Sequence, residues 1–213
     1  MIMKYIKKQN EPASLKQFRA IPGVSYDDYR DKDRLRQSLI EEQGFICCYC
    51  MQRIKLETMH LEHWKPRSLY PESQLDYRNL LAVCEGNEGK PHHLQHCDKR
   101  KGDKEITINP THPKCEKLVK FRSNGEIFSE DDRINQELNN VLNLNIQTLV
   151  INRKNILDFA IRKLTAENRD GTWSKAVLKK ELRKWESLGT DGKYEPFCRI
   201  VIFFLEKKLG KYP

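Results

Sequence analysis

Four cysteines constrain this chain more than any other feature of its sequence. Cys47 and Cys50 are separated by two residues, and Cys84 and Cys97 follow further along the chain. The two-residue gap lets both thiolates of the first pair reach one ion, which favours Cys47 over its neighbour Cys48 as the ligand. Together the four predict a zinc knuckle, a closed tetrahedral four-cysteine site that holds a structural Zn²⁺.

Two features of these cysteines leave alternatives open. Free cysteine is also a common small buried residue, so packing in the core is the alternative to metal binding. Cys84 and Cys97 are further apart than in a compact knuckle, so the stretch 85–95, rich in Gly, Asn, His and Lys, must loop out between them. Three histidines near this loop are alternative ligands in place of one thiolate: His92, His93 and His96.

Composition and charge narrow the class of protein. The chain has 213 residues, with 39 Lys or Arg against 30 Asp or Glu and a formal net charge of +9. A basic balance favours a polyanionic partner such as nucleic acid, although basic solvated faces are also common. No apolar run approaches the length of a membrane span, and the N-terminal residues lack the apolar stretch of a signal peptide. Seven cysteines are then expected to stay reduced, so we predict a cytoplasmic protein with no membrane partner.

The hydrophobic pattern predicts an α+β fold. Residues 31–43 have the spacing of an amphipathic helix closed by Gly44, and residues 61–63 predict a short strand that stops at Pro66. The Asn124-Gly125 pair within residues 121–128 predicts a hairpin with a type I′ turn.

The end of the chain has a different, helical pattern. Apolar stripes predict one helix around residues 156–164, one with Thr172 as its N-cap and one that starts near Pro196. Such stripes are more typical of core packing than of a cofactor site. We therefore divide the chain into residues 1–130, which carry the N-terminal helix and the polar motifs, and a helical C-terminal region, residues 131–213.

An acid-histidine pair, an asparagine and a second acid lie between and after the cysteines. Phosphodiester hydrolysis needs a base for water and an ion that neutralises charge at the leaving oxygen. His63 suits the base, and Glu62 and Asp98 are hard oxygen ligands for Mg²⁺ or Mn²⁺. Asn79 is placed to accept a hydrogen bond from His63 and fix its tautomer. Neighbours on a strand point to opposite faces, so a bulge or turn before Pro66 is expected to bring Glu62 and His63 together.

Each of these polar residues alone is more often a satisfied polar group than part of a site. Their joint order is more specific. The pattern C-x-x-C, E-H-x-x-P, N-L-x-x-x-C and C-D-x-x-K-G resembles the HNH endonuclease superfamily, with its ββα-metal fold. Within it, residues 62–66, 97–102 and the Leu142-Asn143-Leu144-Asn145 stretch resemble the PtuB-like HNH proteins of Septu and retron-associated anti-phage systems. The motif match covers residues 43–103.

This resemblance implies a role for each matched residue. His63 is the general base, Asn79 orients it, and Glu62 and Asp98 fill the first and last metal positions. The superfamily usually has His at the last position, so Asp98 is a departure that leaves His96 as a substitute ligand. Three basic residues are expected to contact phosphate oxygens at the start of a helix: Lys99, Arg100 and Lys101.

The resemblance also implies a function. The chain is expected to be a metal-dependent endonuclease, the toxic effector of an anti-phage complex with a PtuA-like ATPase. In retron systems a reverse transcriptase and its multicopy single-stranded DNA are further partners. The chain has no G-x-x-x-x-G-K-[ST] motif, so nucleotide control is expected from another subunit. Two alternatives stand beside it: the same nuclease acting on RNA such as tRNA, and a non-catalytic zinc-finger-like module that binds nucleic acid or a partner.

Overall fold

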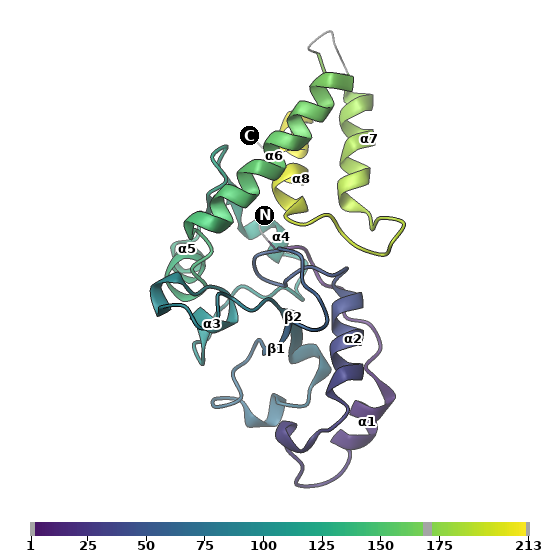
Figure 1. Ribbon diagram of the computed structural model, residues 1–213, viewed down its shortest axis with the longest axis vertical. Helices are drawn as coiled ribbons and strands as arrows, with labels where there is room; N and C mark the ends of the chain where they lie inside the picture. The colour runs from purple at the N-terminus through teal and green to yellow at the C-terminus, as the bar shows by residue number, and fades with distance from the viewer. Residues whose placement is uncertain (1–2, 168–171, 212–213) are drawn as a thin grey trace.

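The computed structural model describes residues 3–167 and 172–211, in which helices are mixed with short antiparallel ribbons (Figure 1). The predicted α+β class is confirmed at this level. The N-terminal part contains α1 (Ala13–Arg19), η1 (Tyr26–Asp28), α2 (Lys32–Glu42), β1 (His60–His63), η3 (Tyr77–Asn79), β2 (Leu80–Val83) and α3 (Asp98–Lys101). The rest contains α4 (Cys115–Leu118), β3 (Lys120–Phe121), β4 (Ile127–Phe128), α5 (Asp132–Gln136), α6 (Gln147–Glu167), α7 (Lys175–Glu186) and α8 (Cys198–Lys208).

Helix α2 confirms the helix predicted over residues 31–43. Asp31 is its N-cap, and its buried face carries Leu35, Leu39 and Ile40. Gly44 ends it at a φ of +58°, a left-handed conformation that favours glycine. A side chain there would also collide with the Tyr194 ring. The helix end is therefore also a contact with the C-terminal part of the chain.

Strands β1 and β2 form an antiparallel ribbon at the centre of the N-terminal part (Figure 1). The register runs from His60 opposite Val83 to His63 opposite Leu80, one residue against one. Every residue of β2 is buried, whereas β1 is buried at Glu62 and His63. Of the bulge or turn expected before Pro66, the structure has the turn: the pairing stays regular through His63, and the chain bends at Trp64 and Lys65.

The predicted hairpin at residues 121–128 is confirmed, but its turn is not type I′. Type I′ needs two consecutive residues with positive φ, and here Gly125 has a φ of +93° without Asn124. Gly125 N donates to Arg122 O, and Arg122 N donates to Glu126 O. These bonds enclose a three-residue loop with glycine at its left-handed position, the other common hairpin connection.

Helices α6, α7 and α8 pack together at one end of the molecule (Figure 1). Helix α7 begins with Ser174 as its N-cap, whose hydroxyl accepts a hydrogen bond from Val177 N, so the predicted cap at Thr172 is two residues early. Helix α8 follows Pro196 as predicted and is almost wholly buried against α6, α7 and β3. None of the described helices is long and apolar enough to cross a membrane.

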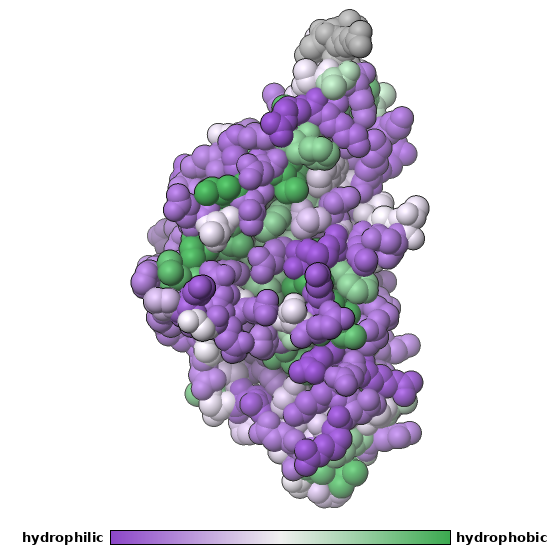
Figure 2. Space-filling model, in the orientation of Figure 1, coloured by the Kyte–Doolittle hydropathy of each residue, from purple (hydrophilic) through white to green (hydrophobic). Residues whose placement is uncertain are grey.

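Backbone hydrogen bonds join the two predicted parts. Tyr194 N donates to Gly44 O at 3.0 Å, and Phe197 N donates to Met51 O at 2.9 Å. The division at residue 130 stays a prediction. The face of the molecule seen in Figure 2 is largely hydrophilic, with apolar side chains in separate groups.

A buried arginine on α6 fastens the hairpin to the segment that precedes α6. Arg153 is 1% exposed; its Nε donates to Gly125 O and its Nη2 to Leu144 O, both at 2.7 Å. Asn145 continues the same network, because its side chain bonds to both the N–H and the carbonyl of Ile127. The Leu142–Asn145 stretch of the motif thus has a structural role: it connects the hairpin to α6 through these hydrogen bonds.

Replacing Arg153 by Leu should therefore destabilise the fold. Two buried carbonyls would lose their donor, which should lower the free energy of unfolding by about 3 kcal/mol. Arg162→Leu, an exposed position of the same helix, is the matched control and should change it little. Chemical denaturation of the three proteins checks this, and equal midpoints would contradict it.

Candidate active site and metal centre

The four predicted cysteines meet in one buried cluster. The ligand atoms of Cys47, Cys50, Cys84 and Cys97 all lie within 4.8 Å of one another. Two of the sulfur pairs are close, with Cys47 Sγ 3.9 Å from Cys97 Sγ and Cys50 Sγ 3.8 Å from Cys84 Sγ. A tetrahedral zinc with Zn–S bonds of ~2.3 Å places its sulfurs ~3.8 Å apart. The cluster therefore fits a metal ion such as zinc.

Distant segments supply these ligands. Cys47 and Cys50 lie in a tight turn in which Met51 N donates to Cys47 O, and Cys84 directly follows β2. Cys97 immediately precedes α3, and its N–H donates to Leu142 O at 2.9 Å. The residues between the second pair loop out as predicted, which explains how their wide spacing is compatible with one site.

Of the three alternative histidine ligands, only His96 lies at the sulfur cluster. His92 and His93 are exposed, and the four sulfurs already make a complete donor set. His96 is buried, with its Nδ1 3.2 Å from Cys97 Sγ and 4.0 Å from Cys84 Sγ. It therefore borders the sulfur cluster, where its ring can hydrogen-bond to a thiolate. Its neighbours do not support the idea that it substitutes for Asp98.

Glu62 and Asp98 come together, as predicted for an acidic metal site. Glu62 is 3% exposed, and its carboxyl group lies close enough to that of Asp98 for the two to interact electrostatically. Burial and the Asp98 charge raise the pKa of Glu62 to about 8, while Lys101 acts in the opposite direction. Two adjoining carboxyl groups that repel each other in a buried place favour either a shared proton or a bound cation.

Two side chains fix the Glu62 carboxylate through a single oxygen. Tyr49 Oη donates to Glu62 Oε1 at 2.7 Å, and Lys101 Nζ lies 2.8 Å from the same atom. Lys101 Nζ also donates to His63 O at 3.2 Å, and the residue is only 2% exposed. The expectation that Lys101 contacts phosphate is therefore wrong in this structure: it is a buried partner of Glu62, because the short α3 directs it inward.

His63 is the last residue of β1, and its ring is held from two sides. Its Nε2 lies 2.9 Å from the carbonyl oxygen of Gln74, which can only accept, so Nε2 carries the hydrogen and Nδ1 keeps a free lone pair. The Tyr26 ring packs perpendicular to the imidazole at 4.6 Å between centroids. Burial lowers the pKa of His63 to about 4, and the nearby positive charges of Arg67 and Lys101 contribute. The ring is thus neutral near pH 7.

Asn79 does not orient His63 as expected. Its Oδ1 accepts from Lys65 N at 2.7 Å, and its Nδ2 donates to Lys65 O and Ser73 O at 3.1 Å each. The side chain therefore ties the turn after β1 to the turn before β2. Gln74, one residue beyond Ser73, supplies the carbonyl that binds His63, so Asn79 acts on the histidine through the loop it fixes.

Lys99 and Arg100 lie on the outer side of α3. Lys99 Nζ is 2.6 Å from Glu88 Oε1, and Arg100 Nη1 donates to His92 O at 3.0 Å. His60, which had no assigned role, pairs with the same Glu88 at 3.2 Å. Helix α3 has only four residues, so its dipole adds little to anion binding. Phosphate contact by Lys99 and Arg100 stays a prediction.

Basic and aromatic side chains surround His63. The guanidinium of Arg67 and the ammonium of Lys32 lie 5.1 and 4.7 Å from the centre of the Tyr26 ring. Lys65 is placed similarly over the Tyr70 ring, at 5.1 Å. Positive charges close to a base that acts beside a phosphodiester would attract that anion.

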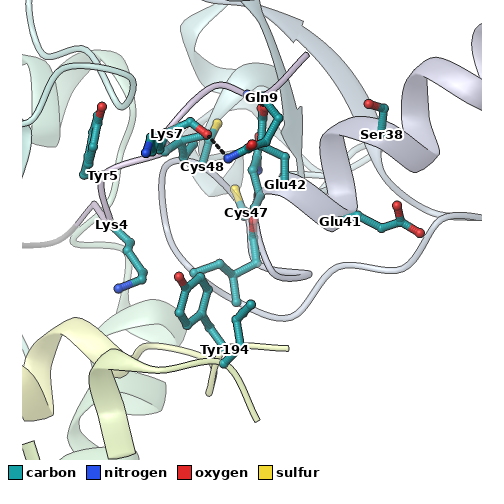
Figure 3. Close-up of a pocket in the computed structure, with 14 residues that line it drawn as sticks. Lys4, Tyr5, Lys7, Gln9, Ser38, Glu41, Glu42, Cys47, Cys48 and Tyr194 are labelled. Carbon is teal, nitrogen blue, oxygen red and sulfur yellow. Dashed lines mark hydrogen bonds between the residues drawn. The ribbon is translucent and has the colours of Figure 1, made fainter. Parts of the chain in front are cut away.

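A pocket of about 550 Å³ lies beside the cysteine turn (Figure 3). Figure 3 shows it between the N-terminal segment with Lys4 and Lys7, the end of α2 with Glu42, and Tyr194. Cys48, a cysteine that is not part of the metal cluster, and its neighbour Cys47 also line it. Glu62, His63 and Asp98 are absent from its described lining, so this pocket is separate from the acidic site.

Sequence reasoning missed three residues that shape the site. Tyr49 stands inside the cysteine motif, but nothing in its spacing shows that its hydroxyl binds Glu62. Gln74 acts through its backbone carbonyl, which no side-chain pattern can show. Asn143 has a φ of +50° and donates to His93 O and Gln95 O, so it braces the loop before Cys97. The sequence signal for Asn143 was its place in the Leu142-Asn143-Leu144-Asn145 stretch.

Comparison with known proteins gives three relatives. The chain is 26% identical to a Vibrio cholerae protein named as the candidate HNH endonuclease of retron Vc95, over 184 residues that cover 81% of this chain and 86% of that protein. It is 33% identical to the Septu protein PtuB of Bacillus thuringiensis over 86 residues, 38% of this chain and 30% of PtuB. It is 34% identical to the candidate HNH endonuclease of retron Ec83 from Escherichia coli over 98 residues, 39% of this chain and 38% of that protein.

No model of a known protein family matches the chain. The relatives nevertheless confirm the resemblance drawn from the motifs: the chain is similar to HNH proteins of retron and Septu systems. The similarity to the retron Vc95 protein extends over most of both chains, whereas those to PtuB and the Ec83 protein cover less than half of each.

The cysteine cluster predicts about one tightly held zinc per chain, as expected for a closed site of four thiolates. Cys47→Ser and Cys97→Ser should each lose this zinc and much of the stability, because structural zinc binding is coupled to folding. Cys48→Ser is the matched control, a buried neighbour that is not a ligand, and should keep its zinc. Elemental analysis after dialysis measures this, and zinc-free wild-type protein would overturn the site.

The environment of His63 predicts an unusual titration. Its folded pKa, about 4, lies below the ~6.5 of an unfolded histidine. Below pH 6.5 the unfolded chain therefore binds a proton that the folded chain does not, so this group lowers stability as the pH falls from 6.5 to 4. NMR of metal-free protein with ¹⁵N-labelled histidine should show a neutral ring at pH 5.5. A folded-state midpoint near 6.5, equal to that in denaturant, would contradict the burial argument.

Proposed function

We propose that this chain is a metal-dependent endonuclease that hydrolyses phosphodiester bonds of nucleic acid as the effector of an anti-phage system. The observation that carries the proposal is the pairing of Glu62 with Asp98 beside His63, a neutral base, on a scaffold of four clustered cysteines. The names of the relatives support the same activity and the same kind of system. The order β1, β2, α3 is compatible with a ββα-metal module.

The carboxylate pair fits a hard divalent cation. Tyr49 and Lys101 both bind Glu62 through Oε1, which leaves Oε2 and the Asp98 carboxylate as donors for Mg²⁺ or Mn²⁺. Such ions commonly use one or two carboxylates together with water and phosphate oxygens. When bound, the ion supplies charge neutralisation at the leaving oxygen of the scissile phosphate. Lys101 and Tyr49 hold the ligand in place for it.

His63 provides the base in this proposal. With Nε2–H donated to the Gln74 carbonyl, the Nδ1 lone pair is the group that accepts a proton from water. The water oxygen then forms a bond to phosphorus as the bond between phosphorus and the leaving oxygen breaks. Asn79 contributes by fixing the two turns that carry Gln74 and the residues after His63.

The positive surroundings of the base suit a nucleic-acid substrate. Arg67 and Lys32 lie over the Tyr26 ring that contacts His63, and Lys65 lies over the Tyr70 ring. We propose that these three and the outward Lys99 and Arg100 contact phosphates. The superfamily that the chain resembles favours DNA. RNA such as tRNA is the alternative substrate, and a non-catalytic nucleic-acid or partner-binding module is the alternative activity.

The proposed partners follow from the family resemblance. A PtuA-like ATPase would restrain the nuclease, and in a retron system a reverse transcriptase with its multicopy single-stranded DNA would complete the complex. The names of the relatives place those proteins in retron and Septu systems, which supports a partner of this kind. Exposed Ile151 and Phe159 on α6, 47% and 54% accessible, are apolar side chains available for such a contact.

His63→Ala should abolish cleavage while leaving the fold intact, because the loss of a general base slows a reaction by about 10²–10⁴-fold. His93→Ala, an exposed histidine outside the site, is the matched control. Labelled DNA and total RNA, each with and without Mg²⁺ or Mn²⁺, identify the substrate and the ion.

Mild chelation should stop cleavage before the protein unfolds, and Mg²⁺ or Mn²⁺ should restore it, because an ion held by two carboxylates exchanges more readily than one in a closed thiolate site. If a folded His63→Ala protein cleaves nucleic acid at nearly the wild-type rate, His63 is not the general base. Binding of nucleic acid without cleavage under every condition would instead favour the non-catalytic module.

A further inference from the structure

We propose that Tyr26 is a positioning residue for His63, so that the candidate active site includes a segment well before the motif region of residues 43–103. The proposal rests on the proposed function, in which His63 is the base. Tyr26 belongs to η1, a short helical turn that precedes α2 and that the motifs do not include. Its contacts with His63 are both direct and indirect.

The direct contact is between the two rings. Their centroids are 4.6 Å apart and their planes meet at 88°, an edge-to-face arrangement. Both side chains are buried, each 8% exposed. A perpendicular neighbour at this distance restricts the rotation of an imidazole about its χ2 bond, because a turned ring would collide with the tyrosine. Tyr26 therefore helps to set the direction in which Nδ1 points.

The indirect contact runs through Gln74. Tyr26 N donates to Gln74 Oε1 at 3.0 Å, and the backbone oxygen of the same glutamine binds His63 Nε2 at 2.9 Å. The three residues thus form a closed triangle in which each contacts the other two. Gln74 selects the tautomer of His63, and Tyr26 holds both the ring of His63 and the side chain of Gln74. Loss of the Tyr26 ring would remove the direct restraint on the imidazole, while the backbone N–H of residue 26 would keep its bond to Gln74.

Tyr26 is itself firmly held. Ser25 precedes it, and the N–H and hydroxyl of Ser25 donate to Asp28 Oδ2 at 3.0 and 2.6 Å, which closes the turn. The ammonium of Lys32 and the guanidinium of Arg67 lie over the Tyr26 ring in cation–π contacts. Arg67 is also paired with Asp27 of the same turn at 2.8 Å. Because Tyr26 is held in place by these contacts, its ring can in turn restrict the position of the His63 ring.

The aromatic ring, and not the hydroxyl, makes the side-chain contact with His63, while the backbone N–H of Tyr26 binds Gln74. Within the described part of the chain no hydrogen bond joins the Tyr26 hydroxyl to another group, and burial raises its pKa to about 12, so it stays neutral. Phenylalanine should therefore preserve the role, whereas an aliphatic side chain such as leucine should not. This separates positioning from a simple need for apolar bulk at the site.

The test compares Tyr26→Leu and Tyr26→Phe in the full-length protein. Tyr26→Leu should lower kcat by about 10- to 100-fold with little change in KM, since small misplacements of a reacting group have effects of this size. Tyr26→Phe should stay within about threefold of wild type. Tyr29→Leu is the matched control: Tyr29 is also buried in this segment, but packs on Phe18 and bonds to Ser14. It should lower the melting temperature and leave kcat unchanged.

A spectroscopic readout works independently of activity. NMR of ¹⁵N-labelled histidine should show His63 as a single Nε2–H tautomer in wild type and in Tyr26→Phe, and averaged tautomers in Tyr26→Leu. If Tyr26→Leu fails to fold, Gln74→Ala replaces it, because that change removes the tether to Tyr26 N and keeps the backbone carbonyl. Averaged tautomers are expected there too.

The outcomes separate the two proposals. A folded Tyr26→Leu protein with wild-type kcat and an unchanged His63 signal would overturn the positioning role and leave the nuclease intact. A fall in kcat that is equally large in Tyr29→Leu would also overturn it, because the effect would then be general destabilisation. If wild type cleaves no nucleic acid, the proposed function fails, while the tautomer measurement still decides whether Tyr26 holds His63.

Discussion

The cluster of four buried sulfurs is the contact on which the rest of the structure depends. It joins the turn after α2, the end of β2 and the start of α3, three segments that are far apart in the sequence. The ribbon of β1 and β2 has only four residues in each strand, and a ribbon of this size is marginal alone. Structural zinc contributes on the order of 10 kcal/mol in small domains, comparable with the whole stability of a protein. A metal at this cluster would therefore determine whether the acidic site can form.

The acidic site is stabilised by what surrounds it. Glu62 and Lys101 bring charges into the interior beside the half-buried Asp98, in a place where separate ions are strongly disfavoured. The buried pair is tolerated because Lys101 neutralises Glu62 and bonds to the backbone of His63, and Tyr49 donates to the same Glu62 carboxylate. Cys97 immediately precedes Asp98, so the sulfur cluster holds one side of this arrangement. On the other side, the regular pairing of β1 with β2 holds Glu62 in place.

The sequence predicted the residues of the site better than their contacts. The four cysteines could be chosen because thiolates at that spacing have a strongly directional chemistry, and the spacing alone excluded Cys48. The proximity of Glu62 and Asp98 followed from the motif order. The partners of Asn79, Lys101 and His63 could not be predicted in this way. Asn79 bonds to backbone atoms of Lys65 and Ser73, and Gln74 contributes a carbonyl that every residue type has.

For secondary structure too, the sequence predicted some features correctly and others not. Local features fixed α2, with its apolar face and its glycine end, and the hairpin at Gly125, because these depend on neighbouring residues. The prediction of a type I′ turn for that hairpin was wrong, because its two strands can be joined by a three-residue loop as well as by a two-residue one. The sequence by itself thus determined which residues can bind metal, which carry apolar faces and where the chain turns. The tertiary structure alone decided that Lys101 points inward to Glu62 and that Tyr26 meets His63, because such contacts depend on distances between segments that no local pattern encodes.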